Sequence, residues 1–427
     1  MNGDRLPVLP LPKSARLRRG HLHAEGEPRL VWAGVRTARL DRAAERLLQQ
    51  FTLLQAGFQI EIDCQAACAR YPALGDDESY ALDVTSEGVC IRAPCEWGVL
   101  RAFATLRLLL KVDKDNVRVR FVSIEDAPRF PWRGLMLDPA RRFLPVTTIE
   151  RTLDGMALAK LNVLHLHLSD DQGFRFHGRT FPELAQASGE YYTTAQLERI
   201  VAYAADRGIR VVPEIDMPGH CTSWLASHPE WTTQGEAVEP SSRFGVHKAC
   251  LDPSRDEVYD ALGVLLADVA RVFPDEFMHI GGDEVHPAWW HESDEIQRYM
   301  HAVGAADLGA LHAHFNARVA DMVKALGRRL MGWDEIAHAG LPKDAVVQSW
   351  RGGASRDRAT RQGFDCVFSA GYYLDLFYPA DIHYAFDPEA SAEELSVLEQ
   401  PHARRSNASR TFDPVWDGRL RSTKRRA

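Results

Sequence analysis

The chain has 427 residues, of which 45% are hydrophobic and 26% are charged, and its formal net charge at pH 7 is −8. This composition is typical of a soluble globular protein that is large enough for two domains and a substantial core. The acidic balance argues against nucleic acid or an anionic membrane surface as a partner. The longest apolar runs are far shorter than a membrane span, so we expect no membrane segment.

The N-terminal sequence and the cysteines both bear on the cellular compartment. Residues 1–20 contain basic side chains, but prolines interrupt their only apolar patch, so no secretory signal is evident. The seven cysteines form no CxxC pair, and Cys64 and Cys68 have no further cysteine or histidine at zinc spacing. We therefore expect a cytoplasmic protein with free thiols.

The first part of the chain mixes strand and helix patterns. Apolar residues recur at helical spacing in residues 40–55 and 95–112. Residues 80–94 are typical of a β-hairpin, and residues 117–126 indicate a further strand. Together these elements predict a small α+β domain over residues 1–128.

From residue 129 the pattern changes to strands that alternate with amphipathic helices. Strands rich in Val, Ile and Leu that alternate with helices indicate parallel βαβ units. Seven such units in succession, without a Gly-rich dinucleotide fingerprint, favour a barrel over an open doubly wound sheet. The predicted fold class is α/β: a (β/α)8 TIM barrel over residues 129–400, preceded by the small α+β domain. The expected strands are residues 133–138, 163–168, 209–215, 277–282, 329–334, 345–350 and 364–370.

The end of the chain does not supply a clear eighth strand. Residues 391–400 are helix-like, and residues 401–427 form an Arg-rich, atypical tail that we expect to be poorly ordered. Either an irregular segment closes the barrel, or the barrel does not close within this chain. The prediction is therefore a barrel that is incomplete at its eighth unit.

Acidic, aromatic and amide side chains follow the predicted strands, at the end of a barrel where active sites are built. Such a set fits a carbohydrate site, because aromatic faces stack on sugar rings while carboxylates and amides bind hydroxyls. No Gly-rich cradle for a phosphate is evident. The residues in question are Asp138, Arg141, Arg142, Asp170, Asp171, Glu214, Asp216, His220, Asp283, Glu284, Trp333, Asp334, Glu335, Gln348, Trp350, Tyr372, Tyr373 and Asp375.

These motifs resemble those of glycoside hydrolase family 20, the β-N-acetylhexosaminidases. The small preceding domain is also similar to the one found in that family. The matching runs, in family order, are "RGLMLDPARRF", "LNVLHLHLSDDQGFRF", "VVPEIDMPGH", "MHIGGDEV", "GWDE", "QSW" and "YYLD".

The resemblance implies removal of terminal β-linked N-acetylhexosamine residues by a retaining, substrate-assisted mechanism. In this mechanism the 2-acetamido group of the sugar is the nucleophile and forms an oxazolinium intermediate. Glu284 would then be the general acid/base, and Asp283 would orient the acetamido group. Because two nearby carboxylates resist ionising together, we expect one of the two pKa values to be raised, which would suit a general acid, and an ionised Asp283 that stabilises the cation.

The resemblance assigns further residues to substrate binding and positioning. Arg133 would grip the sugar hydroxyls, although spacing alone equally allows an ion pair within the barrel with Asp138 or Glu214. Asp170 and His220 would support Glu284 through a hydrogen-bond relay.

Aromatic residues would form the pocket for the acetamido group. Trp333 and Trp350 would be walls for its methyl group, although a buried tryptophan is more often part of the core. Tyr373 would donate to the acetamido oxygen, and Asp375 would bind sugar hydroxyls.

The sequence departs from the family at its end, where a last strand with a tryptophan and a glutamate is expected. Trp416 is the nearest substitute for that tryptophan, and no glutamate replaces the other residue. One alternative function is therefore a catalytically impaired homologue that binds amino sugars with an open barrel.

A second alternative is a metal-dependent barrel hydrolase. His165 and His167 would share one face of a strand, as metal ligands require. Such a site also needs histidines on later strands, which end in Trp, Asp and Gln instead. We expect neither a metal nor a cofactor. The expected partner is a glycan that ends in N-acetylglucosamine or N-acetylgalactosamine, and a homodimer remains an open alternative.

Overall fold

The computed structural model describes residues 6–49, 51, 56–113, 116–338, 340–375 and 379–403. By its internal contacts the chain divides into two compact units. The first contains residues 1–137, 144–165 and 195–212, and the second contains residues 138–143, 166–194 and 213–427. The boundary at residue 128 that the sequence suggests stays a prediction.

The N-terminal sheet is mixed, with the strand order β1-β7-β4-β5-β3-β2, and β6 pairs with β7. The expected hairpin is confirmed, because β4 and β5 pair antiparallel from Ala81 opposite Arg92 to Val84 opposite Val89. The strands are β1 Ser14–Glu25, β2 Glu27–Gly34, β3 Ala56–Ala66, β4 Tyr80–Val84, β5 Gly88–Cys95, β6 Lys111–Asp113 and β7 Asn116–Asp126.

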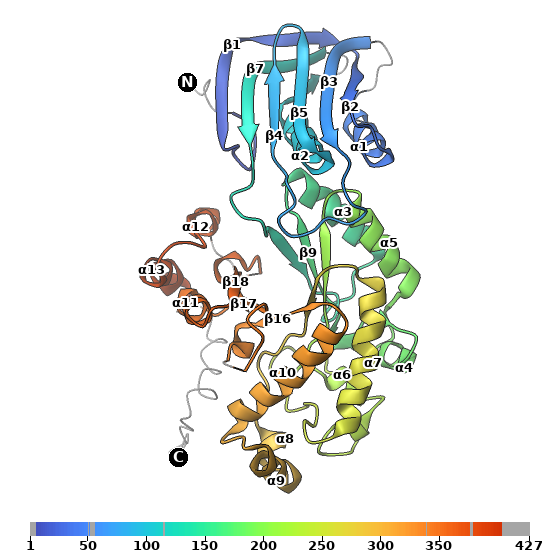
Figure 1. Cartoon of the computed structure of the whole chain (residues 1–427), viewed down its shortest axis with the longest axis vertical. Helices are drawn as coiled ribbons and strands as arrows, with labels where there is room; N and C mark the ends of the chain where they lie inside the picture. Colours follow the sequence, from blue (N-terminus) through green and yellow to red (C-terminus); the bar gives the residue numbers. More distant parts are fainter. Residues whose placement is uncertain are drawn as a thin grey trace. The chain divides into compact units, whose positions relative to one another are not determined.

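Two helices, α1 (Ala38–Leu48) and α2 (Glu96–Leu109), lie together on one face of this sheet (Figure 1). The predicted helix over residues 40–55 is too long, because α1 ends at Leu48 and Phe51 is not helical. Residues 50 and 52–55 lie outside the described residues.

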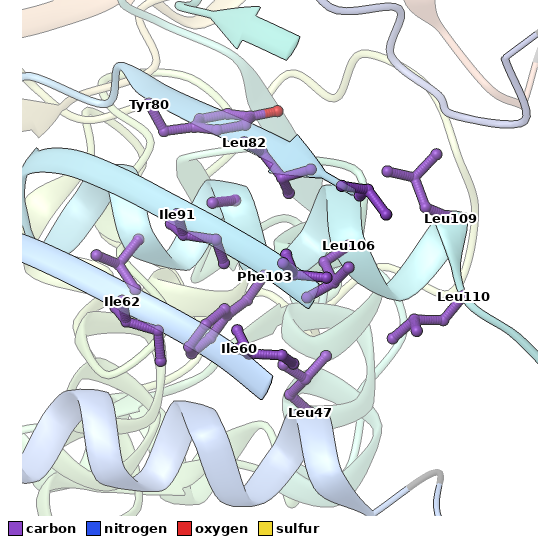
Figure 2. Close-up of a cluster of buried hydrophobic side chains, with 14 of the residues drawn as sticks. Leu47, Ile60, Ile62, Tyr80, Leu82, Ile91, Phe103, Leu106, Leu109 and Leu110 are labelled. Carbon is purple, nitrogen blue, oxygen red and sulfur yellow. The ribbon is translucent and has the colours of Figure 1, made fainter. Parts of the chain in front are cut away.

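The core of this unit forms between the sheet and the two helices. Ile60 and Ile62 of β3 are fully buried and alternate with more exposed residues, as a strand with one buried face requires. Figure 2 shows them on the same side as Ile91 of β5, facing Phe103 and Leu106 of α2.

The second sheet contains all seven predicted strands and follows the order of the chain, β8-β9-β14-β15-β16-β17-β18. The pairs from β14 to β18 are parallel. Over the described residues this topology is that of an incomplete TIM barrel, which confirms the predicted α/β fold. The strands are β8 Gly134–Leu137, β9 Val163–His167, β14 Arg210–Glu214, β15 Phe277–His279, β16 Arg329–Trp333, β17 Val346–Ser349 and β18 Asp365–Phe368.

Helices connect these strands, and short elements fill the loops after them. The connecting helices are α3 Val146–Leu158, α5 Thr194–Ala205, α7 Asp256–Val272, α10 Leu308–Ala325 and α11 Gly353–Arg361. The loop elements are β10 Ser169–Asp170, β11 Gly173–Phe174, β12 Phe176–His177, α4 Pro182–Ala187, β13 Tyr192–Thr193, α6 Thr222–Leu225, η1 Pro229–Trp231, α8 Ala288–His291, α9 Asp294–Val303, η2 Asp334–Ile336 and η3 Ala370–Tyr372.

Within the described residues, β18 is the last strand. It is followed by α12 (Ala380–Ala385) and by α13 (Ala392–Ala403), where the sequence predicts a helix. Figure 1 shows α11 and α13 side by side near β17 and β18. Trp416 and the rest of residues 404–427 lie outside the described residues, so the predictions made for them are untested. No helix in the described part of the chain is long and apolar enough to cross a membrane.

Candidate active site

The backbone turns sharply after β15, because two glycines and a glutamate adopt left-handed conformations. The φ angle is +65° at Gly281, +88° at Gly282 and +47° at Glu284. A Cβ atom on Gly281 would lie 1.8 Å from Asp216 Oδ1, and one on Gly282 would lie 2.4 Å from a methyl carbon of Ile336. Glycine is therefore required at both positions.

This turn allows two adjacent acids to face one histidine. Neighbouring side chains point to opposite faces of a strand, but β15 ends at His279 and the constraint ends with it. Glu284 Oε2 lies 3.5 Å from His220 Nε2, and Asp283 Oδ2 lies 3.6 Å from the same atom. The structure thus brings the predicted catalytic pair together, while the roles assigned to the two acids stay predictions.

The other ring nitrogen of His220 contacts two more acids. Nδ1 lies 3.1 Å from Asp171 Oδ2 and 3.3 Å from Asp170 Oδ1. Burial lowers the pKa of His220, but the carboxylates around it have the larger effect and raise that pKa well above its usual value. Asp170 therefore lies where the predicted relay needs it, and Asp171, which has the shorter contact, was not assigned to the relay. Asp171 is itself held by the backbone N–H of Thr222, which donates to Oδ1 over 3.0 Å.

Buried polar contacts continue from Asp170 to Trp333. His167 Nε2 lies 2.9 Å from Asp170 Oδ2, and His167 Nδ1 lies 2.7 Å from Glu214 Oε2. Trp333 Nε1 donates to the other oxygen of Glu214 over 2.9 Å. His167 is 2% exposed, so it is an interior residue that links two acids of the site.

Arg141 contacts the acidic cluster from the loop after β8. Its Nη2 lies 2.7 Å from Asp170 Oδ2, and its Nη1 lies 2.8 Å from Asp138 Oδ2. The buried Arg175 anchors the same loop by donating to two of its carbonyl oxygens over 2.8 Å each. The side chain of Arg141 stays 29% exposed, so its guanidinium is accessible to a ligand.

The prediction that Arg133 binds the substrate is corrected by the structure. Arg133 precedes β8, and its guanidinium donates to Lys160 O over 3.0 Å, to Phe130 O over 2.8 Å and to Glu78 Oε2 over 2.6 Å. All three nitrogens are therefore engaged by the protein. The alternative, an ion pair, is the correct description, although the partner is Glu78.

Burial raises the pKa of Asp283 to about 6; His220 opposes this rise, and the charges of Glu214 and Glu284 add to it. The expectation that one carboxyl of the pair has a raised pKa is therefore met at Asp283. Asp283 is the more buried of the pair, since its side chain is 14% exposed and that of Glu284 is 29% exposed. With this pKa, Asp283 is still largely ionised at neutral pH, as its predicted role requires.

Glu335 is a second acid with a raised pKa, and it contacts Trp350. Trp350 Nε1 donates to Glu335 Oε2 over 3.1 Å, and Arg351 Nε lies 3.5 Å from Glu335 Oε1. Burial raises the pKa of Glu335 to about 8 against the lowering effect of Arg351, and the charge of Asp283 contributes to this rise. The indole of Trp350 is thus fixed by an acid that interacts with the catalytic pair.

Tyr373 and Asp375 follow η3. Tyr373 is half-buried, and burial raises the pKa of its hydroxyl, with the charges of Asp283 and Asp375 adding to the rise. Asp375 is exposed. Tyr373 therefore lies close enough to Asp283 to interact electrostatically, and the predicted sugar contact of Asp375 stays untested.

The candidate metal-binding group that contains His167 does not suit the metal-dependent alternative. Groups such as His167, Asp170 and Asp216 have oxygen and nitrogen atoms within 4.8 Å of one another. However, both ring nitrogens of His167 face carboxylates, which raise its pKa well above the usual value despite its burial. A protonated imidazole has no lone pair to offer a metal ion.

Several residues of this site were placed at strand ends by the sequence analysis but were given no role there. Asp171 and Glu335 follow predicted strands and Glu214 ends β14, so their position was the available signal. Arg141 gave the same signal, because it follows the first barrel strand whereas Arg133 precedes it.

An incomplete parallel barrel with an acidic pair and a histidine–carboxylate relay at its strand ends defines a TIM-barrel glycoside hydrolase. The chain belongs to glycosyl hydrolase family 20. Residues 130–416 match the catalytic domain of that family, and residues 5–127 match its domain 2.

Relatives of known function support this assignment. A beta-hexosaminidase of Vibrio furnissii is 33% identical over 360 residues, which are 79% of this chain and 59% of that protein. The beta-hexosaminidase subunit beta of Homo sapiens is 34% identical over 330 residues, covering 74% and 58% of the two chains. This chain thus spans about three-fifths of the length of these relatives.

Solved structures give the same picture. The chitobiase of Flavobacterium johnsoniae superposes with a TM-score of 0.85 at 34% identity, over 93% of this chain and 64% of that chain. The exo-beta-N-acetylglucosaminidase of Vibrio harveyi, solved with N-acetylglucosamine, superposes with a TM-score of 0.72 at 28% identity, over 85% and 60% of the two chains.

Proposed function

We propose that this protein is a β-N-acetylhexosaminidase, which hydrolyses terminal β-linked N-acetylhexosamine residues of glycans with retention of configuration. Family membership supports the activity, and the amino sugar bound to the Vibrio harveyi enzyme supports the substrate class. The observation that carries the proposal is the contact of both Asp283 and Glu284 with His220 Nε2.

This contact favours a nucleophile supplied by the substrate. A retaining enzyme with its own nucleophile needs two carboxyl groups on opposite sides of the scissile bond. Asp283 and Glu284 instead approach the same nitrogen atom from adjacent positions in the chain. One can therefore serve the leaving group while the other serves the acetamido group on the same sugar ring.

In the proposed reaction, Glu284 donates a proton to the glycosidic oxygen as the acetamido carbonyl oxygen attacks C1. The bond to the leaving group breaks, and an oxazolinium ring forms. Asp283 accepts a hydrogen bond from the acetamido N–H and stabilises the positive charge of that ring. Glu284 then takes a proton from the water that attacks C1, and the ring reopens to the N-acetyl sugar. His220 holds Glu284, and Asp170 and Asp171 hold the His220 ring.

Two further roles follow from the same geometry. Arg141, with its accessible guanidinium, is suited to bind hydroxyls of the terminal sugar with its planar set of donors. Tyr373, beside Asp283, is suited to donate to the acetamido oxygen and to hold it in line for attack.

The test compares hydrolysis of chitobiose and of the nitrophenyl β-glycoside of N-acetylglucosamine by the wild type and by Glu284→Gln. We expect kcat/KM of the variant to fall by about 10²–10⁴-fold on chitobiose, because a sugar leaving group needs the proton. The loss should be smaller for nitrophenol, which leaves without help. Glu292→Gln, an exposed glutamate of the same segment, is the matched control and should retain activity.

A nitrophenyl β-glucoside, which lacks the acetamido group, should be a far poorer substrate. Equal turnover of the two nitrophenyl glycosides would contradict the substrate-assisted mechanism. A protein that binds a thiazoline mimic of the intermediate in calorimetry but hydrolyses neither substrate would instead be a non-catalytic amino-sugar binder.

A further inference from the structure

Two cysteines of the N-terminal sheet lie at the same edge of two neighbouring strands. β3 and β5 are parallel, and Ala66 at the end of β3 is opposite Cys95 at the end of β5. Cys68 follows two residues after Ala66, and Cys95 is also the residue before the first turn of α2. The topology therefore brings the two thiols to one place, although they are far apart in the chain.

Side chains fix the backbone around Cys68 to the start of α2. Glu96 Oε2 accepts from the backbone N–H of Cys68 over 2.8 Å and also pairs with Arg39. Arg39 Nη2 in turn donates to Ala69 O over 2.9 Å and to Arg70 O over 2.8 Å. Glu96 is 2% exposed, so this attachment is a buried ion pair and not a mobile surface contact.

The Cys68 and Cys95 side chains lie close enough to interact, and this interaction is the largest influence on the pKa of both thiols. It lowers the pKa of Cys95 to about 7, with a further contribution from the backbone N–H groups of Trp97 and Gly98 at the start of α2, and it raises the pKa of Cys68. When protonated, the Cys95 thiol has the carbonyl oxygen of Asp77 as an acceptor at 3.0 Å.

The remaining cysteines provide the contrast. These are Cys64, Cys90, Cys221, Cys250 and Cys366, and burial raises the pKa of each of their thiols. Cys95 is the one cysteine of the seven whose pKa is lowered. Both Cys68 and Cys95 are partly exposed. A reagent in solution can therefore reach the pair.

We infer that Cys68 and Cys95 are a reactive dithiol that oxidises reversibly to a disulfide by exchange with a small-molecule disulfide such as oxidised glutathione. The Cys95 thiolate attacks one sulfur of the oxidant, forms a mixed disulfide and releases one glutathione thiolate, which takes up a proton. Cys68 then loses its proton and attacks the Cys95 sulfur, so that the second glutathione leaves as a thiolate. Two protein thiols are oxidised to one disulfide, and one glutathione disulfide is reduced to two thiols.

The test is a redox titration of the full chain in mixtures of oxidised and reduced glutathione. Samples are quenched, alkylated and analysed by intact mass and by peptide mapping. We expect the number of alkylated thiols to fall from seven by two, with one cross-linked peptide that joins Cys68 to Cys95. Reductant should restore all seven. A constant titre of seven under oxidising conditions, or a different pair in the cross-linked peptide, would overturn the inference.

Single variants separate the two chemical roles. Cys68→Ala should stop at the mixed disulfide and retain one glutathione on Cys95, whereas Cys95→Ala should acquire none at Cys68. The pH midpoint of Cys95 alkylation should be about 7 in the wild type and higher in Cys68→Ala, which lacks the interacting thiol. Cys90→Ala, another partly exposed cysteine of the same sheet, is the control and should behave as the wild type. Equal midpoints in the wild type and Cys68→Ala would show that the thiols do not interact.

Discussion

Replacing Asp283 with asparagine should stabilise the protein at neutral pH while abolishing its activity. Burial raises the pKa of this carboxyl to about 6 from a usual value of 3.8, and Glu214 and Glu284 add to the rise while His220 opposes it. At neutral pH the site therefore holds a buried negative charge at a free-energy cost, and an amide of the same shape removes that charge.

The magnitude follows from the pKa shift. A shift of about two pKa units corresponds to about 3 kcal/mol. Because the folded-state pKa of Asp283 lies above the unfolded value, its contribution to stability is fully present below about pH 3.8 and is lost as the pH rises through about 6. Asp283→Asn should thus gain about 3 kcal/mol in the free energy of unfolding near pH ~7.5, and roughly half of that near pH ~5.

Urea unfolding followed by tryptophan fluorescence at these two pH values measures the effect. Asp321→Asn, an exposed acid on α10, is the control and should show no gain that depends on pH. A destabilised Asp283→Asn, or a gain of equal size at both pH values, would refute the reasoning. Loss of turnover in the same stabilised variant would show that the charge is kept for function rather than for folding.

Three further results are expected. Gly281→Ala should lower the free energy of unfolding by at least about 2 kcal/mol and reduce kcat in enzyme assays, because its Cβ would overlap Asp216 Oδ1 at a φ of +65°; wild-type values for both would contradict the described turn. The value of kcat/KM should fall about tenfold per pH unit below about pH 6, because Asp283 is protonated there. A kcat/KM that stays constant over this range would show that activity does not require ionised Asp283. Trp350→Phe removes the donor that lowers the pKa of Glu335, and it should raise KM severalfold with little change in kcat; a lower kcat at constant KM would assign Trp350 to the chemical step.

The strands and their order could be predicted because parallel strands are buried on both faces. A strand such as β9 (Val163–His167) is buried at every residue, and this produces an apolar run that needs no knowledge of its neighbours. The end of α1 could not be predicted in the same way. Phe51 packs against the core although it lies outside the helix, so the apolar spacing continues past Leu48.

The site residues that could be predicted are those whose place at the end of a strand puts them in the site. Asp170, His220, Asp283 and Glu284 all follow strands, and the structure brings them together. Arg133 was misassigned, because a guanidinium fits a sugar or an ion pair equally well and only its place before β8 distinguishes the two. The partner of Arg133 comes from a distant part of the chain, and no local pattern indicates such a pairing.

The left-handed backbone at Glu284 is the feature that sequence reasoning could not supply and that the chemistry requires. Two glycines indicate a turn, but a glutamate with a φ of +47° is strained and is maintained only by its surroundings. His220, at a φ of +49°, is strained in the same way, and its ring contacts both acids of the pair. Strain at two contacting residues and a buried charge at Asp283 all act against folding. Their coincidence at one site is the pattern expected where selection has favoured the position of a proton donor over the stability of the fold.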